Sequence, residues 1–271
     1  MHPTHMALRR LGLAVALALV AAPALVSAKD LPAPRALIDR HLAAIGGADA
    51  LRDSGDGTAK ISIEVAENGM RGDMVLYARG EDLVMNMTMM GMQISMGSVG
   101  GVSWSIDPML GPRLIEGEEL EEQRRQMDPD VLTFSDAAIE SMKTVALADS
   151  EGRPCYRVEI AWKDGNDTAT CFDVDDGLAL SSEFTSTSPM GETRQTMHLY
   201  DYKQYGAVKM ASRMQGKTMG MTQIMTIDSF EFGTPPDSAF ALPAAIVALT
   251  QADADAEDVG KDEARTEAGA E

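Results

Sequence analysis

Residues 85–96 read MNMTMMGMQISM, with six methionines in twelve positions. Apolar residues that alternate with polar ones at a period of two indicate a β-strand, whereas a period of three or four indicates a helix. A turn at Met90–Gly91, or in the four residues 89–92, preserves this alternation on both sides of the turn. The type of turn stays open, because methionine is a poor residue for positive φ. The stretch predicts a β-hairpin with one methionine-rich face, on which the opposed residues are Met85 with Met96, Met87 with Ile94, and Met89 with Met92.

Two further stretches predict hairpins of the same kind. Asn68–Gly69 is a strong two-residue hairpin signal, because both residues tolerate positive φ. A turn there opposes Val65 with Gly72, Ile63 with Met74, and Ile61 with Leu76. In residues 208–225 the prediction is a turn centred on Gly216–Lys217. This turn opposes Met214 with Met219, Ser212 with Met221, Met210 with Gln223, and Val208 with Met225.

Strands and turns of this kind recur along most of the chain, and helical patterns are few. Apolar residues at helical spacing follow Pro34 and end at Gly46–Gly47, a short second helix is expected at residues 48–51, and residues 116–127 predict a charged surface or lid helix. The predicted fold class is mainly β: a curved antiparallel half-barrel of about 11–12 strands, covered by two or three short helices.

Such a sheet has an apolar face that the helices look too small to fill, so we expect a cavity between the sheet and its cover. Methionine suits the wall of a cavity because its side chain is flexible and polarizable. A packed core without a cavity would give the same sequence pattern, and this alternative stays open. The predicted lining residues are Met85, Met87, Met89, Met92, Met96, Met210, Met214, Met219, Met221 and Met225.

The ends of the chain indicate its compartment and its domain limits. Residues 1–28 combine Arg9–Arg10, an apolar run and the small-residue site Val26-Ser27-Ala28, which predicts a cleavable signal cut after Ala28 and a periplasmic protein without a membrane span. Residues 29–245 are expected to form a single domain, and residues 246–271 an acidic, Ala-rich disordered tail. The net charge of −19 makes nucleic acid an improbable partner.

Catalytic chemistry is sparse, so we predict no enzyme activity, no cofactor and no metal site of hard or borderline ligands. His41 and His198 are interpreted as structural, because no G-x-S-x-G elbow accompanies them. Cys155 and Cys171 lie on neighbouring predicted strands, where an exported protein permits a disulfide. A three-residue loop around Gly165 places them about 13 Å apart, so the bond requires a bulge or a longer loop. Both the bonded and the free state stay open.

Copper(I) is an alternative ligand, because thioethers select this soft ion. Met85, Met87 and Met89 have M-x-M spacing, as do Met219 and Met221. On one strand this spacing separates the sulfurs by roughly 7 Å, too far to share an ion without a third strand or a bend. The sequence therefore favours an apolar lining over a copper site.

Several segments in order resemble the LolA/LolB-like outer-membrane lipoprotein-sorting family, especially its uncharacterised members. They are ALIDRHLAAIGGADAL (36–51), GGVSWSIDPMLGPRLIEGEELEEQRRQ (100–126), GRPCYRVEI (152–160), FDVDDGLAL (172–180) and DSAFALP (237–243). The resemblance spans about residues 34–243 and implies a half-open barrel that carries lipid acyl chains across the periplasm. The chain departs from the family in lacking a lipidated cysteine and in carrying an acidic tail, and no gating arginine can be assigned.

Together these features predict a non-enzymatic periplasmic carrier of lipid or lipoprotein acyl chains, with an envelope transport partner that has a basic surface. The alternatives are a copper(I)-binding protein that uses the same methionines, and a structural envelope module that docks a basic partner through its acidic surface.

Overall fold

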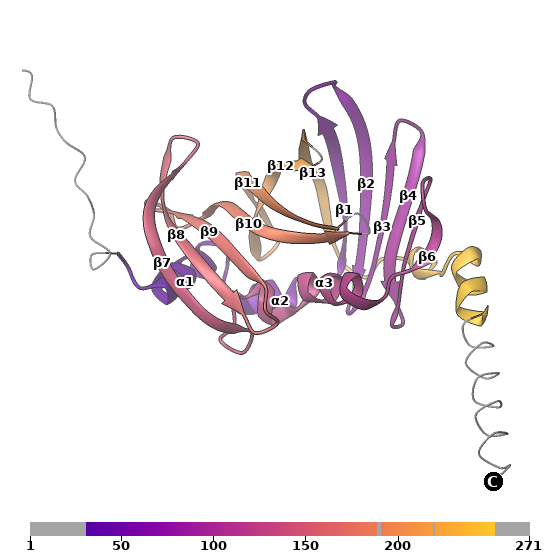
Figure 1. Ribbon diagram of the computed structural model, residues 1–271, viewed down its shortest axis with the longest axis horizontal. Coiled ribbons are helices and arrows are strands. Elements are labelled where there is room, and N and C mark those ends of the chain that lie inside the picture. The colour runs from indigo at the N-terminus through magenta and orange to yellow at the C-terminus, as the bar shows by residue number, and fades with distance from the viewer. Residues whose placement is uncertain (1–30, 189–190, 219, 253–271) are drawn as a thin grey trace, which may run out of the picture.

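Thirteen antiparallel strands form one open sheet in the computed structural model, which describes residues 31–188, 191–218 and 220–252 (Figure 1). The strands are β1 (Gly57–Val65), β2 (Met70–Arg79), β3 (Asp82–Met89), β4 (Met92–Val99), β5 (Val102–Asp107), β6 (Gly111–Leu114), β7 (Ile139–Ser150), β8 (Arg153–Trp162), β9 (Asp167–Asp173), β10 (Ala179–Ser188), β11 (Gly191–Tyr205), β12 (Val208–Thr218) and β13 (Met221–Phe232). The helices are α1 (Pro34–Ala44), α2 (Ala48–Asp53), α3 (Gly117–Met127), α4 (Pro129–Leu132) and the 3-10 helix η1 (Asp237–Phe240). The predicted fold class is confirmed, with slightly more strands than expected.

The strand order is β6-β5-β4-β3-β2-β1-β13-β12-β11-β10-β9-β8-β7. Sequence neighbours therefore pair as hairpins, except for β6 and β7, and β1 also pairs with β13, the last strand. The chain passes from one edge strand, β6, to the other, β7, through α3 and α4. The predicted signal peptide, residues 1–28, lies outside the described part of the chain.

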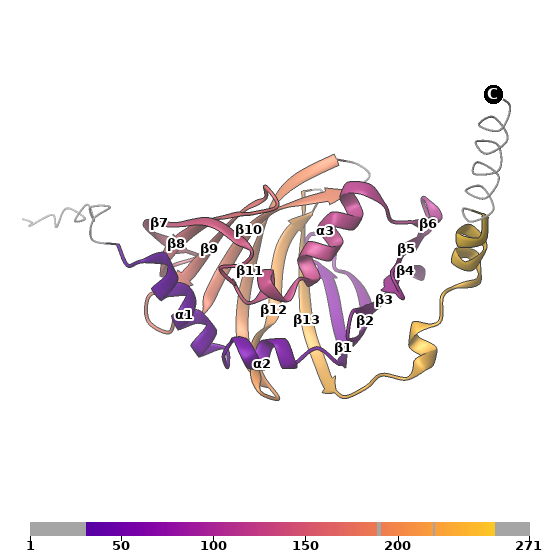
Figure 2. The same cartoon turned by 90° about the horizontal axis from the view of Figure 1, so that it is seen from below.

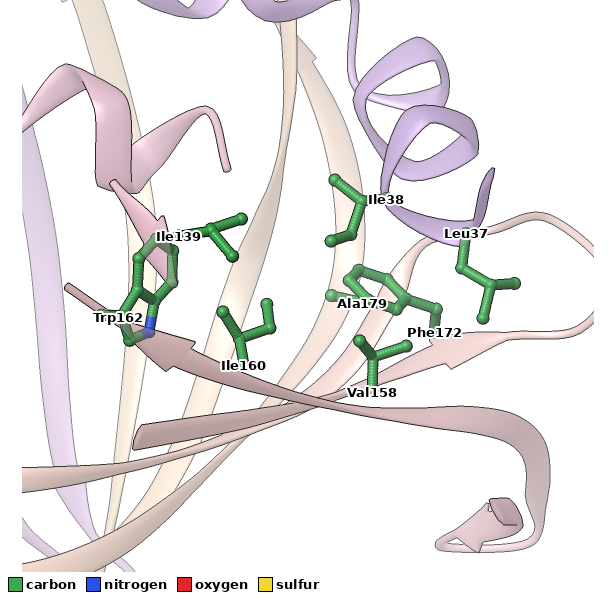
Figure 3. Packing of buried hydrophobic residues seen from close by; sticks show 8 residues of the cluster. All are labelled: Leu37, Ile38, Ile139, Val158, Ile160, Trp162, Phe172 and Ala179. Atoms are coloured by element: carbon green, nitrogen blue, oxygen red, sulfur yellow. The ribbon is translucent and has the colours of Figure 1, made fainter. Parts of the chain in front are cut away.

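The sheet curves, and α1, α2 and α3 lie along one side of it (Figures 1 and 2). We call this side the inner face. Under β7–β10 the inner face is closely packed: Leu37 and Ile38 of α1 are buried against Val158, Phe172 and their neighbours, as Figure 3 shows. Pro34 begins this helix at its first turn, where the missing N–H would have no partner within the helix.

On the opposite, outer face, the C-terminal part of the chain packs against β2–β6. Residues 244–252 are helical, and Ile246 is fully buried together with Phe240 against Val84 and Trp104. The packed domain thus extends beyond residue 245, where the sequence analysis placed its end. The remainder of the expected tail, residues 253–271, lies outside the described residues. No helix in the described part of the chain is long and apolar enough to cross a membrane.

A disulfide joins Cys155 of β8 to Cys171 of β9, with 5.4 Å between the Cα atoms. The predicted register of this hairpin was wrong by two residues, because Tyr156 pairs with Phe172 rather than with Val174. The shift makes the two cysteines diagonal neighbours on the outer face, within the span that a disulfide needs. They are buried with Leu180 in a small cluster on that face.

The hairpin of β1 and β2 also differs from its predicted register by two residues. Ile63 pairs with Gly72 rather than Met74, and Val65 pairs with Met70. The connection is a four-residue loop, residues 66–69, in which only Gly69 has positive φ. Because side chains alternate with a period of two, the shift leaves the same residues on the apolar face.

Candidate ligand-binding face

The hairpin of β3 and β4 has the predicted register. Met85 pairs with Met96, Met87 with Ile94, and Met89 with Met92. Its two-residue turn has φ of 52° at Met90 and 78° at Gly91. Positive φ at both central positions is the signature of the type I′ turn, whose twist matches that of the flanking strands. Met90 therefore adopts a left-handed backbone conformation that is unfavourable for methionine, and its side chain is 67% exposed.

Strand β2 continues the apolar surface beside this hairpin. Met74 lies opposite Met87, and Leu76 lies opposite Met85. Met70 and Met74 were not among the predicted lining residues, although their alternation with Gly72 and Leu76 on one face could have identified them. Together β2, β3 and β4 form a continuous patch of thioether side chains.

The predicted register of β12 and β13 was wrong. Met214 pairs with Met225, and Thr218 pairs with Met221, so Gly216 and Lys217 lie inside β12 and not at a turn. Met219 lies outside the described residues. The shift is an even number of residues, so Met214, Met221 and Met225 still share one face, and Met210 joins them by two-residue alternation along β12.

Pairing of β13 with β1 connects the two methionine hairpins. Met225 lies opposite Ile63, and Ile63 in turn lies opposite Gly72 of β2. On the other side, Met197 of β11 lies opposite Gly216. We call this continuous surface the methionine face; its methionines are Met70, Met74, Met85, Met87, Met89, Met92, Met96, Met197, Met210, Met214, Met221 and Met225.

The methionine face is part of the inner face of the sheet. Ser98, two residues beyond Met96 on β4, lines a cavity of about 590 Å³ together with Gln123 and Met127 of α3. Figure 2 shows α3 on this side of the sheet. The structure therefore brings the nine described residues of the predicted lining set onto the side that the helices cover in part.

Exposure distinguishes these methionines from the packed core. Ile63 and Val65 at the centre of the face are buried, but every methionine of the face is at least partly accessible, and Met92 is 50% exposed. No methionine in the described part of the chain is buried. The face thus presents apolar, flexible side chains that are not packed into a core.

Helix α3 is held across the sheet by ion pairs near its two ends. Arg113 of β6 makes a bidentate pair with Glu119, with both N–O distances at 2.7 Å, and this pair raises the pKa of Arg113. Near the other end, Arg125 donates to Glu122 and pairs with Asp164 at 3.2 Å. A second cavity, of about 560 Å³, lies between this part of α3 and the β8–β9 hairpin and is lined mainly by charged side chains.

The two histidines lie on opposite faces and cannot act together. His41 is buried on α1, where its Nδ1–H donates to the Gly177 carbonyl at 3.2 Å. Burial lowers its pKa to about 4. His198 stacks on Tyr200 of the same strand. Within the described ranges, no three His, Cys, Asp or Glu side chains are grouped so that they could hold a metal ion.

Comparisons with known proteins concern the fold. No protein-family model matches the sequence, and no curated protein matches it. The chain is similar to the crystal structure of a DUF1329 family protein from Desulfovibrio piger, at 13% identity and a TM-score of 0.48, over 76% of this chain and 96% of that one. It is also similar to a LolA superfamily protein from Nitrosomonas europaea, at 12% identity and a TM-score of 0.47, over 78% and 99%.

A third similar structure is LprF from Mycobacterium bovis, at 10% identity and a TM-score of 0.30, over 79% of this chain and 99% of that chain. The similarities thus include the superfamily that the sequence resembles. At these identities and TM-scores they say nothing about a ligand or an activity, so the function has to be inferred from the chain's own residues.

Proposed function

We propose that this protein is a non-enzymatic periplasmic carrier that holds acyl chains of a lipid or lipoprotein against the methionine face. The observation that carries the proposal is the exposure pattern: thioether side chains from six strands, β2–β4 on one side of β1 and β11–β13 on the other, line one face, and none of the described methionines is packed in the core. Large accessible apolar surfaces on one side of a protein mark binding sites.

The energetics suit an acyl chain. Burial contributes about 0.8 kcal/mol per methylene, so about ten methylenes laid along the face gain about 8 kcal/mol before the cost of immobilising the chain. An acyl chain has no polar group along its length that needs a hydrogen-bonding partner on the face. Flexible methionines can also adapt to chains that differ in length or in unsaturation.

The test begins with protein isolated from the periplasm of its expression host. Organic extraction of the denatured protein, followed by lipid mass spectrometry, measures the molar amount of bound acyl chain. Binding of a fluorescent fatty acid then measures affinity for wild type and for Met87→Gln with Met214→Gln, which places two amides on the methionine face. We expect affinity to fall at least tenfold.

A matched control is Met109→Gln with Met90→Gln, because both side chains lie in turns and are 90% and 67% exposed. This variant should bind the probe as the wild type does. The carrier proposal is wrong if the isolated protein contains no acyl lipid and the probe does not bind, or if both double variants lose affinity equally.

A further inference from the structure

Three adjacent strands bring four thioethers together at one place on the methionine face. Met74 of β2 lies directly opposite Met87 of β3, and Met85 of β3 lies directly opposite Met96 of β4. Met85 and Met87 are two residues apart on β3 and so project from the same side. The four side chains thus form a zigzag across the sheet, in the order 74, 87, 85, 96.

Cross-strand pairing overcomes the spacing problem of M-x-M on one strand. Directly opposed residues have Cβ atoms only about 4.5–5.5 Å apart, compared with roughly 7 Å along a strand. Methionine adds three rotatable bonds beyond Cα, which lets sulfurs from different strands turn toward a common point. Met87 therefore has Met74 as a thioether neighbour across the strand pair and has Met85 and Met89 along its own strand, while Met85 has Met96 across the strand pair and Met87 along its strand.

The surroundings favour a soft ion over a hard one. The oxygen-bearing side chains of the same strands, Asp73, Asn86 and Ser95, alternate with the methionines and face the outer side of the sheet. Thioethers bind copper(I), whereas oxygen ligands suit magnesium, calcium and manganese. The chain has two cysteines, and both are in the disulfide, so no free thiol competes for the ion.

Access is also suitable for a metal ion. Met74, Met85, Met87 and Met96 are each partly buried. An ion can therefore enter from solvent, while the apolar neighbours Ile61, Leu76 and Ile94 limit contact between the bound ion and water. All four ligands are neutral, so they do not compensate the charge of the bound ion. Removing one positive charge from water costs less than removing two, which favours copper(I) over divalent ions.

We propose that Met74, Met85, Met87 and Met96 form a copper(I)-binding site. Binding is a simple coordination step in which the ion keeps its oxidation state. The site does not depend on the carrier proposal, because it needs the thioether sulfurs themselves and not an apolar surface: leucine can replace methionine as acyl-chain lining but not as a copper ligand.

The experiment is an anaerobic titration of the full-length protein, as isolated, with copper(I) held by ascorbate and a coloured copper(I) chelator. We expect one copper(I) per protein at the tightest site. Met74→Leu with Met87→Leu should weaken this binding at least tenfold, since leucine conserves volume and preserves the hairpin. The control Met90→Leu with Met109→Leu removes two exposed thioethers and should change affinity less than twofold. Circular dichroism checks that each variant is folded.

Silver(I), a redox-stable probe of the same ligand preference, gives a second readout in the wild type. With methionine methyl groups labelled by carbon-13, the first equivalent of silver(I) should shift the resonances of the four proposed ligands and leave that of Met109 in place. The proposal is overturned if the chelator retains all of the copper, if both leucine variants lose affinity to the same extent, or if silver(I) first shifts the exposed methionines.

Discussion

Acidification should destabilise this protein through a single buried histidine. His41 of α1 is only 6% exposed and lies among aromatic rings, with ring centroids 5.1 Å from Phe172 and 6.1 Å from Phe134. Its Nδ1–H is donated to the carbonyl of Gly177, so a second proton has to be added at Nε2. That proton creates a charge in the apolar contact between α1 and the sheet.

The size of the effect follows from the change in pKa. Burial lowers the pKa of His41 from 6.5 to about 4 in the folded protein, although the hydrogen bond to Gly177 acts in the opposite direction. Between these values the unfolded chain binds the proton and the folded protein does not, so stability is highest above pH 6.5 and falls as the pH decreases. At 1.36 kcal/mol per pKa unit, the loss at pH 4 is about 3 kcal/mol.

Substitution of His41 by asparagine isolates the contribution of its protonation to the stability of the fold. His41→Asn places an amide donor near the position of Nδ1 but has no titratable proton. Urea denaturation at half-unit intervals from pH 4 to pH 7.5 measures the free energy of unfolding of both proteins. The difference, wild type minus variant, should decrease by up to about 1.4 kcal/mol per pH unit below pH 6.5.

The other carboxylates and basic groups are common to both proteins, so their titration cancels in this difference. The comparison at pH 7.5 gives the cost of the substitution itself, because His41 is then neutral in both folded and unfolded states. Parallel curves for the two proteins over the whole range would show that His41 has the same pKa in the folded and unfolded states, as it would if its site were open to water.

Three further changes test local features of the fold. Met90→Gly removes the strain of a left-handed methionine in an exposed turn and should raise the free energy of unfolding by about 1 kcal/mol. A free energy of unfolding below that of the wild type would contradict the turn geometry. Cys155→Ala with Cys171→Ala removes a bridge between residues 16 apart in sequence. It should lower stability by about 3 kcal/mol in urea denaturation, and an unchanged midpoint would refute the contribution of the bridge. Ile246→Ala should cost about 2–4 kcal/mol and increase acrylamide quenching of Trp104 fluorescence, unless the C-terminal helix does not cover that ring.

Whether the register of a hairpin could be predicted depended on its turn. In residues 85–96 the only glycine lies at the turn, and the alternation on both sides fits a single register. In β12 the glycine at position 216 indicated a turn but lies inside the strand. The Sδ and Cε atoms of Met197 lie about 3.3–3.4 Å from the position that a Cβ of Gly216 would occupy. A glycine in a strand can thus mark a close side-chain approach, which sequence alone does not distinguish from a turn.

The loop after β1 shows a second limit. Asn68–Gly69 signals a two-residue turn, but the Asn68 side chain instead accepts a hydrogen bond from the backbone N–H of Met70. Glu67, in the same loop, accepts from the backbone N–H of Thr222 on β13. These contacts come from the side chains and from a strand distant in sequence, so local turn propensity could not predict the shift of two residues.

The C-terminal helix was missed because composition outweighed periodicity. Residues 246–271 are acidic and rich in alanine, as expected of a solvated tail. Ile246 and Leu249 are nevertheless three residues apart and pack on the same apolar cluster under the C-terminal segment. Two apolar residues are too few to define a helical stripe, so the partner surface formed by Val84 and Trp104 could be identified only from the three-dimensional arrangement.

The division of side chains between the two parts of the inner face explains why a packed core and a binding face looked alike in sequence. Beneath α1, the buried members of the cluster on β7–β10 are aromatic, branched or alanine side chains. Beyond α3, whose own apolar side chains are Leu120 and Met127, the sheet is lined by methionine instead. Both patterns alternate with a period of two, and only the position of the helices separates them. If methionine served only to fill gaps in a core, it would occur among the buried residues of the described ranges, and none is found there. The fully buried positions beneath α1 are therefore occupied by side chains other than methionine, and the accessible part of the inner face by the more adaptable methionines.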